Sequence, residues 1–183
     1  MLAPLTEILS VELPWRDSLH EYLDLIIPLI RPWSEDLREE RFFVSEQGEK
    51  PWLEISADDY IKEAVLHYFN QEGEYVKVVE GNVSTGRWRY FGGSNKLVID
   101  YGGNSIMYEL KYLDDHFFIL RKYGYGPNTP YLFLGHEPIV RLLEWRDCVE
   151  LLFDTYRRRA RNVRLMLGAG LVLIVLILLF SIV

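Results

Sequence analysis

The sequence predicts an α+β protein with a helical N-terminal segment, a six-strand antiparallel meander or small barrel, and a long C-terminal helix that continues into one transmembrane span. Three observations support this fold class. Apolar residues recur at helical spacing in the first fifty residues and again after residue 137. Between them, short apolar and aromatic runs alternate with turns rich in glycine and asparagine. The final stretch of the 183-residue chain is an uncharged apolar run.

Residues 1–50 form the N-terminal segment, which we expect to be partly helical and partly irregular. In Asp17–Ile30 the apolar residues fall at helical spacing, and Pro28 should kink or end this helix. Ser34 is a good N-cap, and the acidic residues that follow it favour a short second helix. A secretory signal is not expected, because Met1–Ser10 has no basic start and only a short apolar stretch.

Residues 51–137 form the predicted β-rich domain. Its first part, residues 51–71, starts as a strand or loop and then has two interpretations, a helix over Asp59–Phe69 or an extended segment over Ala64–Phe69. From Gly73 onward, six runs are separated by turns in which glycine and asparagine supply the positive φ angles of tight hairpins. The six predicted strands are Glu74–Val79, Arg87–Phe91, Lys96–Tyr101, Ser105–Leu113, His116–Tyr123 and Tyr131–Leu134. Their short links favour a strongly curved sheet or a small barrel.

An ordered set of motifs runs through about residues 65–135 of this domain. The motifs are Phe69-x-x-x-Gly73-x-Tyr75, Gly86-Arg87-Trp88 at the start of a strand, Lys96-Leu97-Val98-Ile99, Tyr108-Glu109-Leu110 and the aliphatic strand Phe117–Leu120. In this order they resemble the small bacterial lipocalin-like β-barrel domains. The resemblance implies a barrel whose base is plugged by Trp88, with an interior that often binds a small apolar ligand.

Inward-facing aromatic residues of these strands are the candidate ligand-binding residues. Ile106, Tyr108, Leu110 and Tyr112 should share one face of their strand. The same aromatic rings have a second interpretation as ordinary core residues that fill the barrel. The candidates are Trp88, Tyr90, Tyr108 and Tyr112.

Residues 138–164 predict one amphipathic helix, with a regular apolar seam at spacings of three and four that begins at Leu142 and ends at Tyr156. It ends in a collar of arginines, which we expect at the membrane surface and in contact with anionic lipid. Residues 165–183 predict a single-pass transmembrane helix. Basic residues beside a span stay in the cytoplasm, so the N-terminal domain should be cytoplasmic and the C-terminus on the far side, across the inner membrane in a bacterium. The collar consists of Arg157, Arg158, Arg159, Arg161 and Arg164.

The charge distribution and the reactive residues exclude several functions. All 27 acidic residues precede the collar, so residues 1–156 have 15 basic residues and a net charge of −12, which argues against a nucleic-acid partner. The four histidines have no metal-ligand spacing among themselves or to Cys148, and no catalytic motif is present. Asp114-Asp115-His116 suggests a solvated turn before a strand. The sequence therefore predicts no enzyme, no metal and no cofactor.

Two functions follow from this organisation. The first is a membrane-tethered cytosolic interaction or scaffold protein that forms a subunit of a membrane-associated assembly. Its partner would be another protein or a second copy of the chain. The alternative is a ligand-binding module that holds an apolar molecule or lipid in a lipocalin-like cavity near the bilayer.

Overall fold

A computed structural model describes residues 13–45, 49–57, 64–126, 129–158, 161–162, 166 and 170. The chain divides into two compact units, Trp15–Val149 on the one hand and Met1–Pro14 with Glu150–Val183 on the other. Most of the described structure belongs to the first unit, which contains the barrel and its cavity. In the second unit, the described residues 150–158 are helical.

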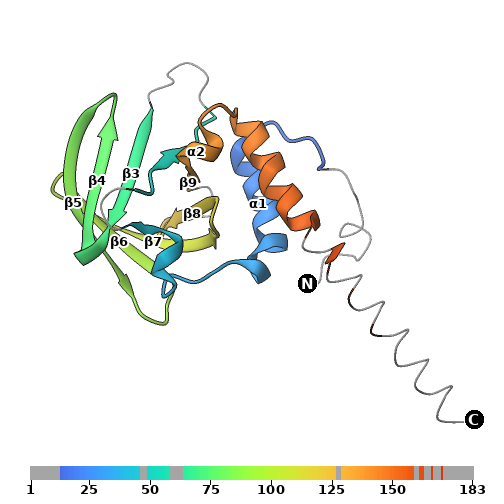
Figure 1. The fold of residues 1–183 in the computed structure, drawn as a ribbon, viewed down its shortest axis with the longest axis horizontal. Coiled ribbons are helices and arrows are strands. Elements are labelled where there is room, and N and C mark those ends of the chain that lie inside the picture. Colours follow the sequence, from blue (N-terminus) through green and yellow to red (C-terminus); the bar gives the residue numbers. More distant parts are fainter. Residues whose placement is uncertain are drawn as a thin grey trace, which may run out of the picture. The chain divides into compact units, whose positions relative to one another are not determined.

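The first unit is built on a closed antiparallel β-barrel of eight strands (Figure 1). The barrel closes because β3 pairs with both β2 and β4, and a two-residue strand, β1, pairs in parallel with the end of β3. In the described residues the strands are β1 (Val44–Ser45), β2 (Trp52–Glu54), β3 (Val65–Asn70), β4 (Glu74–Val79), β5 (Asn82–Phe91), β6 (Lys96–Tyr101), β7 (Asn104–Leu113), β8 (Phe117–Lys122) and β9 (Tyr131–His136).

The prediction of a six-strand sheet is wrong, because the barrel has eight strands. All six predicted runs are strands, β4 to β9, but the ring closes only through β2 and β3. The extended interpretation of Ala64–Phe69 holds, since β3 covers Val65–Asn70, and residues 58–63 lie outside the described residues. Six strands leave two unpaired edges, whereas closure pairs every strand of the ring.

Tight turns set the strand order of the barrel. Glu80 and Gly81, between β4 and β5, both have positive φ, and so do Gly102 and Gly103 between β6 and β7. Positive φ at two successive residues is the geometry of the hairpin turn that suits the twist of two antiparallel strands. Gly86 has a different role, because a Cβ there would overlap the carbonyl oxygen of Asp100 on the neighbouring strand.

One end of the barrel interior is filled by large rings, which we call the aromatic floor. The ring of Phe118 lies 5.1 Å from Phe43, 5.3 Å from Phe69 and 5.7 Å from Trp52, measured between centroids. Phe43 comes from the chain before β1, and its carbonyl accepts a hydrogen bond from Trp52 Nε1 at 3.2 Å. Rings at these separations pack as a closed core. The aromatic floor consists of Phe43, Trp52, Phe69, Trp88 and Phe118.

The N-terminal helix α1 (Leu19–Ile30) lies outside the barrel (Figure 1). Ser18 caps it by accepting a hydrogen bond from Glu21 N at 3.2 Å. Pro28 lies inside its last turn, and the helix ends two residues later in a 3₁₀ turn, η1 (Arg31–Trp33). Two further 3₁₀ turns, η2 (Glu40–Phe42) and η3 (Gln71–Gly73), precede β1 and β4.

The predicted continuous helix over 138–164 is also wrong. The structure has a four-residue helix, α2 (Glu137–Val140), then a turn, and helical backbone again over 145–158. The second helix has its own start, because the Asp147 carboxylate accepts a hydrogen bond from Glu144 N at 3.0 Å. Leu142, placed on the predicted apolar seam, lies in the turn and is 92% exposed.

The structure therefore has no long C-terminal helix in its described part, and none of the described helices is long and apolar enough to span a membrane. The predicted span at 165–183 lies outside the described residues, apart from Met166 and Gly170.

Candidate ligand-binding cavity

The barrel contains a cavity of about 590 Å³ at the end opposite the aromatic floor. Three strands show this arrangement, because each supplies one ring to the floor and one polar side chain to the cavity, two or four residues away. β2 supplies Trp52 and Glu54, and β3 supplies Phe69 and His67. On β8, Phe118 lies in the floor and Lys122 lines the cavity. The alternation of a strand therefore places one layer of polar groups above a sealed core.

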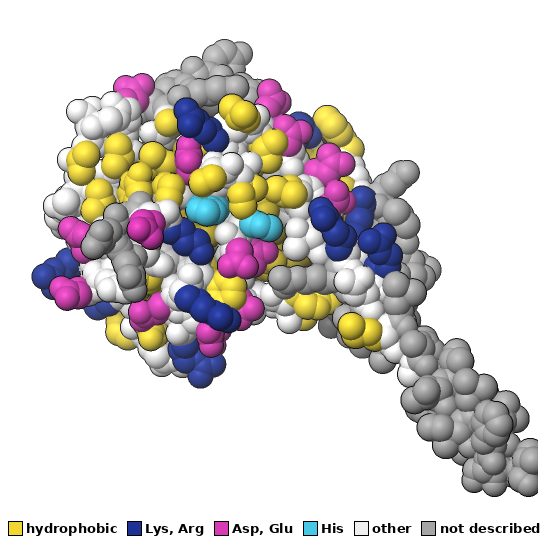
Figure 2. All heavy atoms as spheres, viewed as in Figure 1, with side chains coloured by type: hydrophobic (Ala, Val, Ile, Leu, Met, Phe, Trp, Pro, Cys, Tyr) yellow, Lys and Arg dark blue, Asp and Glu magenta, His cyan; other side chains and the backbone are white. Residues whose placement is uncertain are grey.

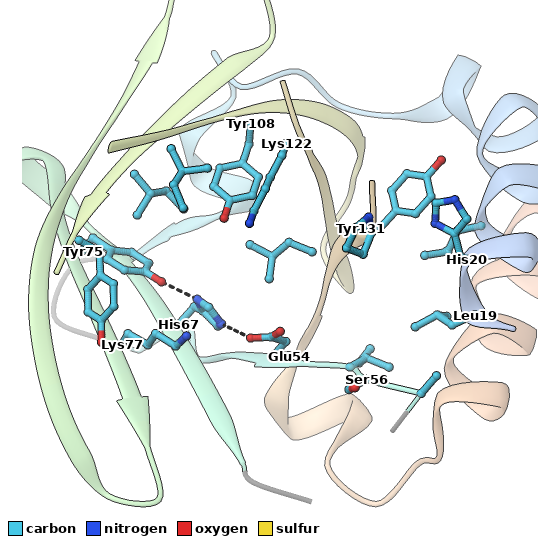
Figure 3. A pocket seen from close by; sticks show the side chains of 18 of the residues that line it. Leu19, His20, Glu54, Ser56, His67, Tyr75, Lys77, Tyr108, Lys122 and Tyr131 are labelled. Carbon is cyan, nitrogen blue, oxygen red and sulfur yellow. Dashed lines mark hydrogen bonds and ion pairs between the residues drawn. The ribbon is translucent and has the colours of Figure 1, made fainter. Parts of the chain in front are cut away.

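A chain of hydrogen bonds crosses the wall of the cavity (Figure 3). The hydroxyl of Tyr75 lies 2.6 Å from Nδ1 of His67, and Nε2 of His67 lies 3.0 Å from a carboxylate oxygen of Glu54. These three residues, from β4, β3 and β2, are called the Glu54–His67–Tyr75 chain. His67 is only 3% exposed, so both of its ring nitrogens are used within the protein.

The environment determines where the protons of this chain lie. Burial lowers the pKa of His67 below its usual value of 6.5, which keeps the imidazole neutral. The hydrogen bond from His67 lowers the pKa of Glu54, and burial raises the pKa of Tyr75. Tyr75 O–H therefore donates to Nδ1, and Nε2–H donates to the Glu54 carboxylate. A protonated phenol and a neutral, enclosed imidazole make a fixed polar wall.

Two lysines point into the cavity from opposite parts of the barrel (Figure 3). Lys77 of β4 is the direct cross-strand neighbour of His67, and its ammonium lies 5.8 Å from the centre of the Tyr101 ring. Lys122 of β8 is the direct cross-strand neighbour of Tyr108 on β7. Direct neighbours on one face have Cβ atoms about 5 Å apart, so the side chain of each lysine lies beside a ring, the imidazole of His67 or the phenol of Tyr108.

The remaining lining is largely apolar. Ile99, Ile106 and Leu132 contribute aliphatic surface, and Leu19 of α1 lies at the rim. Tyr131, also at the rim, donates its hydroxyl to Asp24 at 2.5 Å, so its polar end is already paired. The cavity thus combines an apolar part with a small number of placed polar groups, the usual composition of a small-molecule site.

One of the four predicted ligand-binding residues, Tyr108, lines this cavity. Trp88 lies in the aromatic floor, where its Nε1 donates to Asn70 O at 2.8 Å, and Tyr90 stacks on it with a centroid distance of 6.4 Å. Tyr112 lies outside the cavity. A β-bulge between Leu110 and Tyr112 reverses the alternation of β7, so that the expected single face ends at the bulge.

Sequence reasoning missed the polar residues of the cavity, namely Glu54, His67, Tyr75, Lys77 and Lys122. They come from four strands and have no common motif. The one local signal is a charged residue at an inward position of an apolar strand, as in Val76-Lys77-Val78. A lysine there is unexpected in a packed core, where charged groups are rarely buried without a partner.

The other predicted sites have different outcomes. Among the described residues, no group of three or more His, Cys, Asp or Glu side chains is arranged to hold a metal. Asp114 is not solvated as predicted but 4% exposed, because it accepts two backbone hydrogen bonds, from His116 N and Phe117 N.

The arginine collar is described only in part. Arg157 lies 3.1 Å from Asp154 and over the ring of Phe153, and Arg158 and Arg161 are exposed. Arg159 and Arg164 lie outside the described residues.

Comparison with protein-family profiles, curated proteins and solved structures gives no significant match to this chain. The closed eight-strand antiparallel barrel is consistent with a lipocalin-like barrel.

Proposed function

We propose that the protein binds a small organic molecule in the barrel cavity. The observation that supports this most directly is the cavity itself, because its volume of about 590 Å³ falls within the usual range for small-molecule sites, about 300–1,000 Å³. The lipocalin-like resemblance of residues 65–135 supports the same proposal, since such barrels hold ligands in their interior.

The polar wall favours binding over catalysis. In the Glu54–His67–Tyr75 chain, each ring nitrogen of His67 already has a partner, and the raised pKa of Tyr75 keeps its hydroxyl protonated. The pKa of His67 is lowered and that of Tyr75 is raised, so both shifts oppose transfer of the tyrosine proton to the imidazole, the step that would activate the hydroxyl as a nucleophile. The chain instead holds the Glu54 carboxylate at a fixed place in the wall.

The scaffold function stays a prediction. On the face shown in Figure 2, acidic and basic side chains are interspersed, so the acidic excess of the chain forms no single-sign region there. Among the described residues, the cavity is the feature that indicates a class of binding partner, a small molecule.

The test uses the full chain and a neutral fluorescent probe, 1-pyrenebutanol, whose excitation by energy transfer from tryptophan reports binding. Ile106→Trp should fill the cavity, because Ile106 lines it and is only partly buried. Val83→Trp is the matched control, since Val83 is 65% exposed and does not line the cavity. We expect saturable binding to the natural chain and to Val83→Trp, and at least tenfold weaker binding to Ile106→Trp.

Circular dichroism verifies that both variants keep the barrel. Absence of saturable binding to the natural chain, or equal binding to a folded Ile106→Trp protein, would contradict the proposal.

A further inference from the structure

We propose that the ligand of this cavity is an organic acid, whose anionic group is bound by the ammonium of Lys122 and the hydroxyl of Tyr108 while its apolar body lies against Ile99, Ile106 and Leu132. This inference rests on the proposed function and specifies the chemistry of the ligand. It follows from which polar groups of the cavity already have partners, from the charges on its wall, and from the pairing of β7 with β8.

Several polar groups of the cavity are already paired within the protein. The Glu54–His67–Tyr75 chain is closed on itself, and the Tyr131 hydroxyl donates to Asp24. Neither lysine of the cavity makes an ion pair within the part of the chain that the structure describes, but Lys77 lies near the Tyr101 ring and its charge acts on Glu54. Lys122 has no such neighbour among the described contacts, although its side chain is partly buried and points into the cavity (Figure 3). A partly desolvated cation without a counter-ion gains free energy from a ligand that supplies the negative charge.

The charges on the cavity wall favour an anion. Glu54 carries one negative charge, Lys77 and Lys122 carry two positive charges, and His67 is neutral. The Glu54 carboxylate is already engaged, chiefly by its hydrogen bond from His67 and also by the nearby charge of Lys77. The positive charge that remains is therefore at Lys122, on the β8 side of the barrel.

The pairing of β7 with β8 makes this charge part of a two-donor site. Tyr108 and Lys122 are direct cross-strand partners and both line the cavity. Burial raises the pKa of Tyr108, so its hydroxyl is protonated and can donate. An ammonium and a phenol hydroxyl on neighbouring strands can each donate to one oxygen of a carboxylate, and hydrogen bonds to charged groups are stronger than neutral ones. Ile99, Ile106 and Leu132 line the same cavity and can contact the apolar body of the ligand.

The experiment compares two probes with the same apolar body, 1-pyrenebutyric acid and 1-pyrenebutanol, on the full chain at neutral pH. We expect the acid to bind at least tenfold more tightly than the alcohol. In Lys122→Met this preference should fall to twofold or less, because the substitution weakens the binding of the acid far more than that of the alcohol. Lys122→Arg keeps the charge and should retain most of the preference.

Lys96→Met is the matched control. Lys96 lies over the ring of Tyr123, 3.7 Å from its centre, and does not line the cavity. Removing its charge should leave the affinities for both probes unchanged. Tyr108→Phe should weaken the binding of the acid alone, by a smaller factor than Lys122→Met.

The outcomes separate this inference from the proposed function. Equal binding of acid and alcohol, or an acid preference that survives in folded Lys122→Met, overturns the anion site and leaves cavity binding intact. If neither probe binds the folded natural chain, both the inference and the proposed function fail.

Discussion

Replacing Phe118 by alanine tests whether the end of the barrel that holds the aromatic floor is a solid core or a continuation of the cavity. Phe118 is fully buried at the centre of the aromatic floor and does not line the cavity. Its ring lies within 5.1–5.7 Å of the rings of Phe43, Phe69 and Trp52. Alanine would remove the ring from between three others that are held by separate strands and by the chain before β1.

The expected cost is large because the neighbouring rings cannot collapse into the space. A buried Phe→Ala change costs about 3–5 kcal/mol, which includes the lost transfer free energy and a cavity term of about 24 cal/mol per Å³. This lowers the ratio of folded to unfolded protein by roughly two to nearly four orders of magnitude. In a chain of this size, the same change lowers the melting temperature by roughly 6–20 °C.

The assay is urea unfolding followed by tryptophan fluorescence, with Phe91→Ala as the control. Phe91 is 46% exposed, so its removal should cost about 1 kcal/mol or less. We expect folded Phe118→Ala to bind 1-pyrenebutanol as the natural chain does. A loss of stability below about 1 kcal/mol for Phe118→Ala would refute the packed floor, and would mean that the cavity extends through the barrel.

Three further predictions concern the barrel and its polar groups. Gly86→Ala should destabilise the protein by about 1–3 kcal/mol in urea unfolding, because the new Cβ overlaps the Asp100 carbonyl and forces β5 and β6 apart; unchanged stability would contradict this. Asp114→Ala should cost about 2–3 kcal/mol in the same assay, because two backbone N–H groups and a buried tyrosine hydroxyl lose their acceptor, whereas a loss under 0.5 kcal/mol would show that water replaces it. Stability should fall as the pH drops below 6.5, since burial lowers the pKa of His67 in the folded state and the unfolded chain then binds the proton more readily. A midpoint of urea unfolding that stays constant from pH 7 to 5 would contradict the neutral imidazole. Glu54, whose pKa is lowered from its usual value of 4.5 by its hydrogen bond from His67, should cause a further loss of stability as the pH falls below 4.5.

Local patterns were sufficient for the strands of the meander. The bounds of β4 and β6 agree with the predicted runs Glu74–Val79 and Lys96–Tyr101, because alternation and glycine turns are properties of neighbouring residues. β2 has three residues, too short to show alternation, and the extended β3 competes with a helical pattern in the same stretch. Their strand character depends on pairing with each other and with β9, which a local pattern does not contain.

Tyr112 shows why the predicted site was only partly correct. Its place on one face with Tyr108 follows from strict alternation, and the bulge after Leu110 breaks that alternation. The prediction of one continuous C-terminal helix was wrong for a similar reason, because the apolar seam begins at Leu142, where the chain makes a turn. Periodicity indicates what a segment prefers, and one inserted residue or turn changes which side chains face inward.

The sequence by itself determined the antiparallel character of the domain, six of its strands and its hairpin turns, since these depend on contacts between residues close in the chain. Only the tertiary structure decided that the barrel closes with eight strands, that aromatic rings seal one half, and that Glu54, His67, Tyr75, Lys77 and Lys122 meet in the other half. These residues are brought together by the pairing of strands around a closed ring, which depends on the burial and hydrogen bonding of the whole barrel. Because they come from separate strands, no fixed spacing in the sequence predicts that they meet.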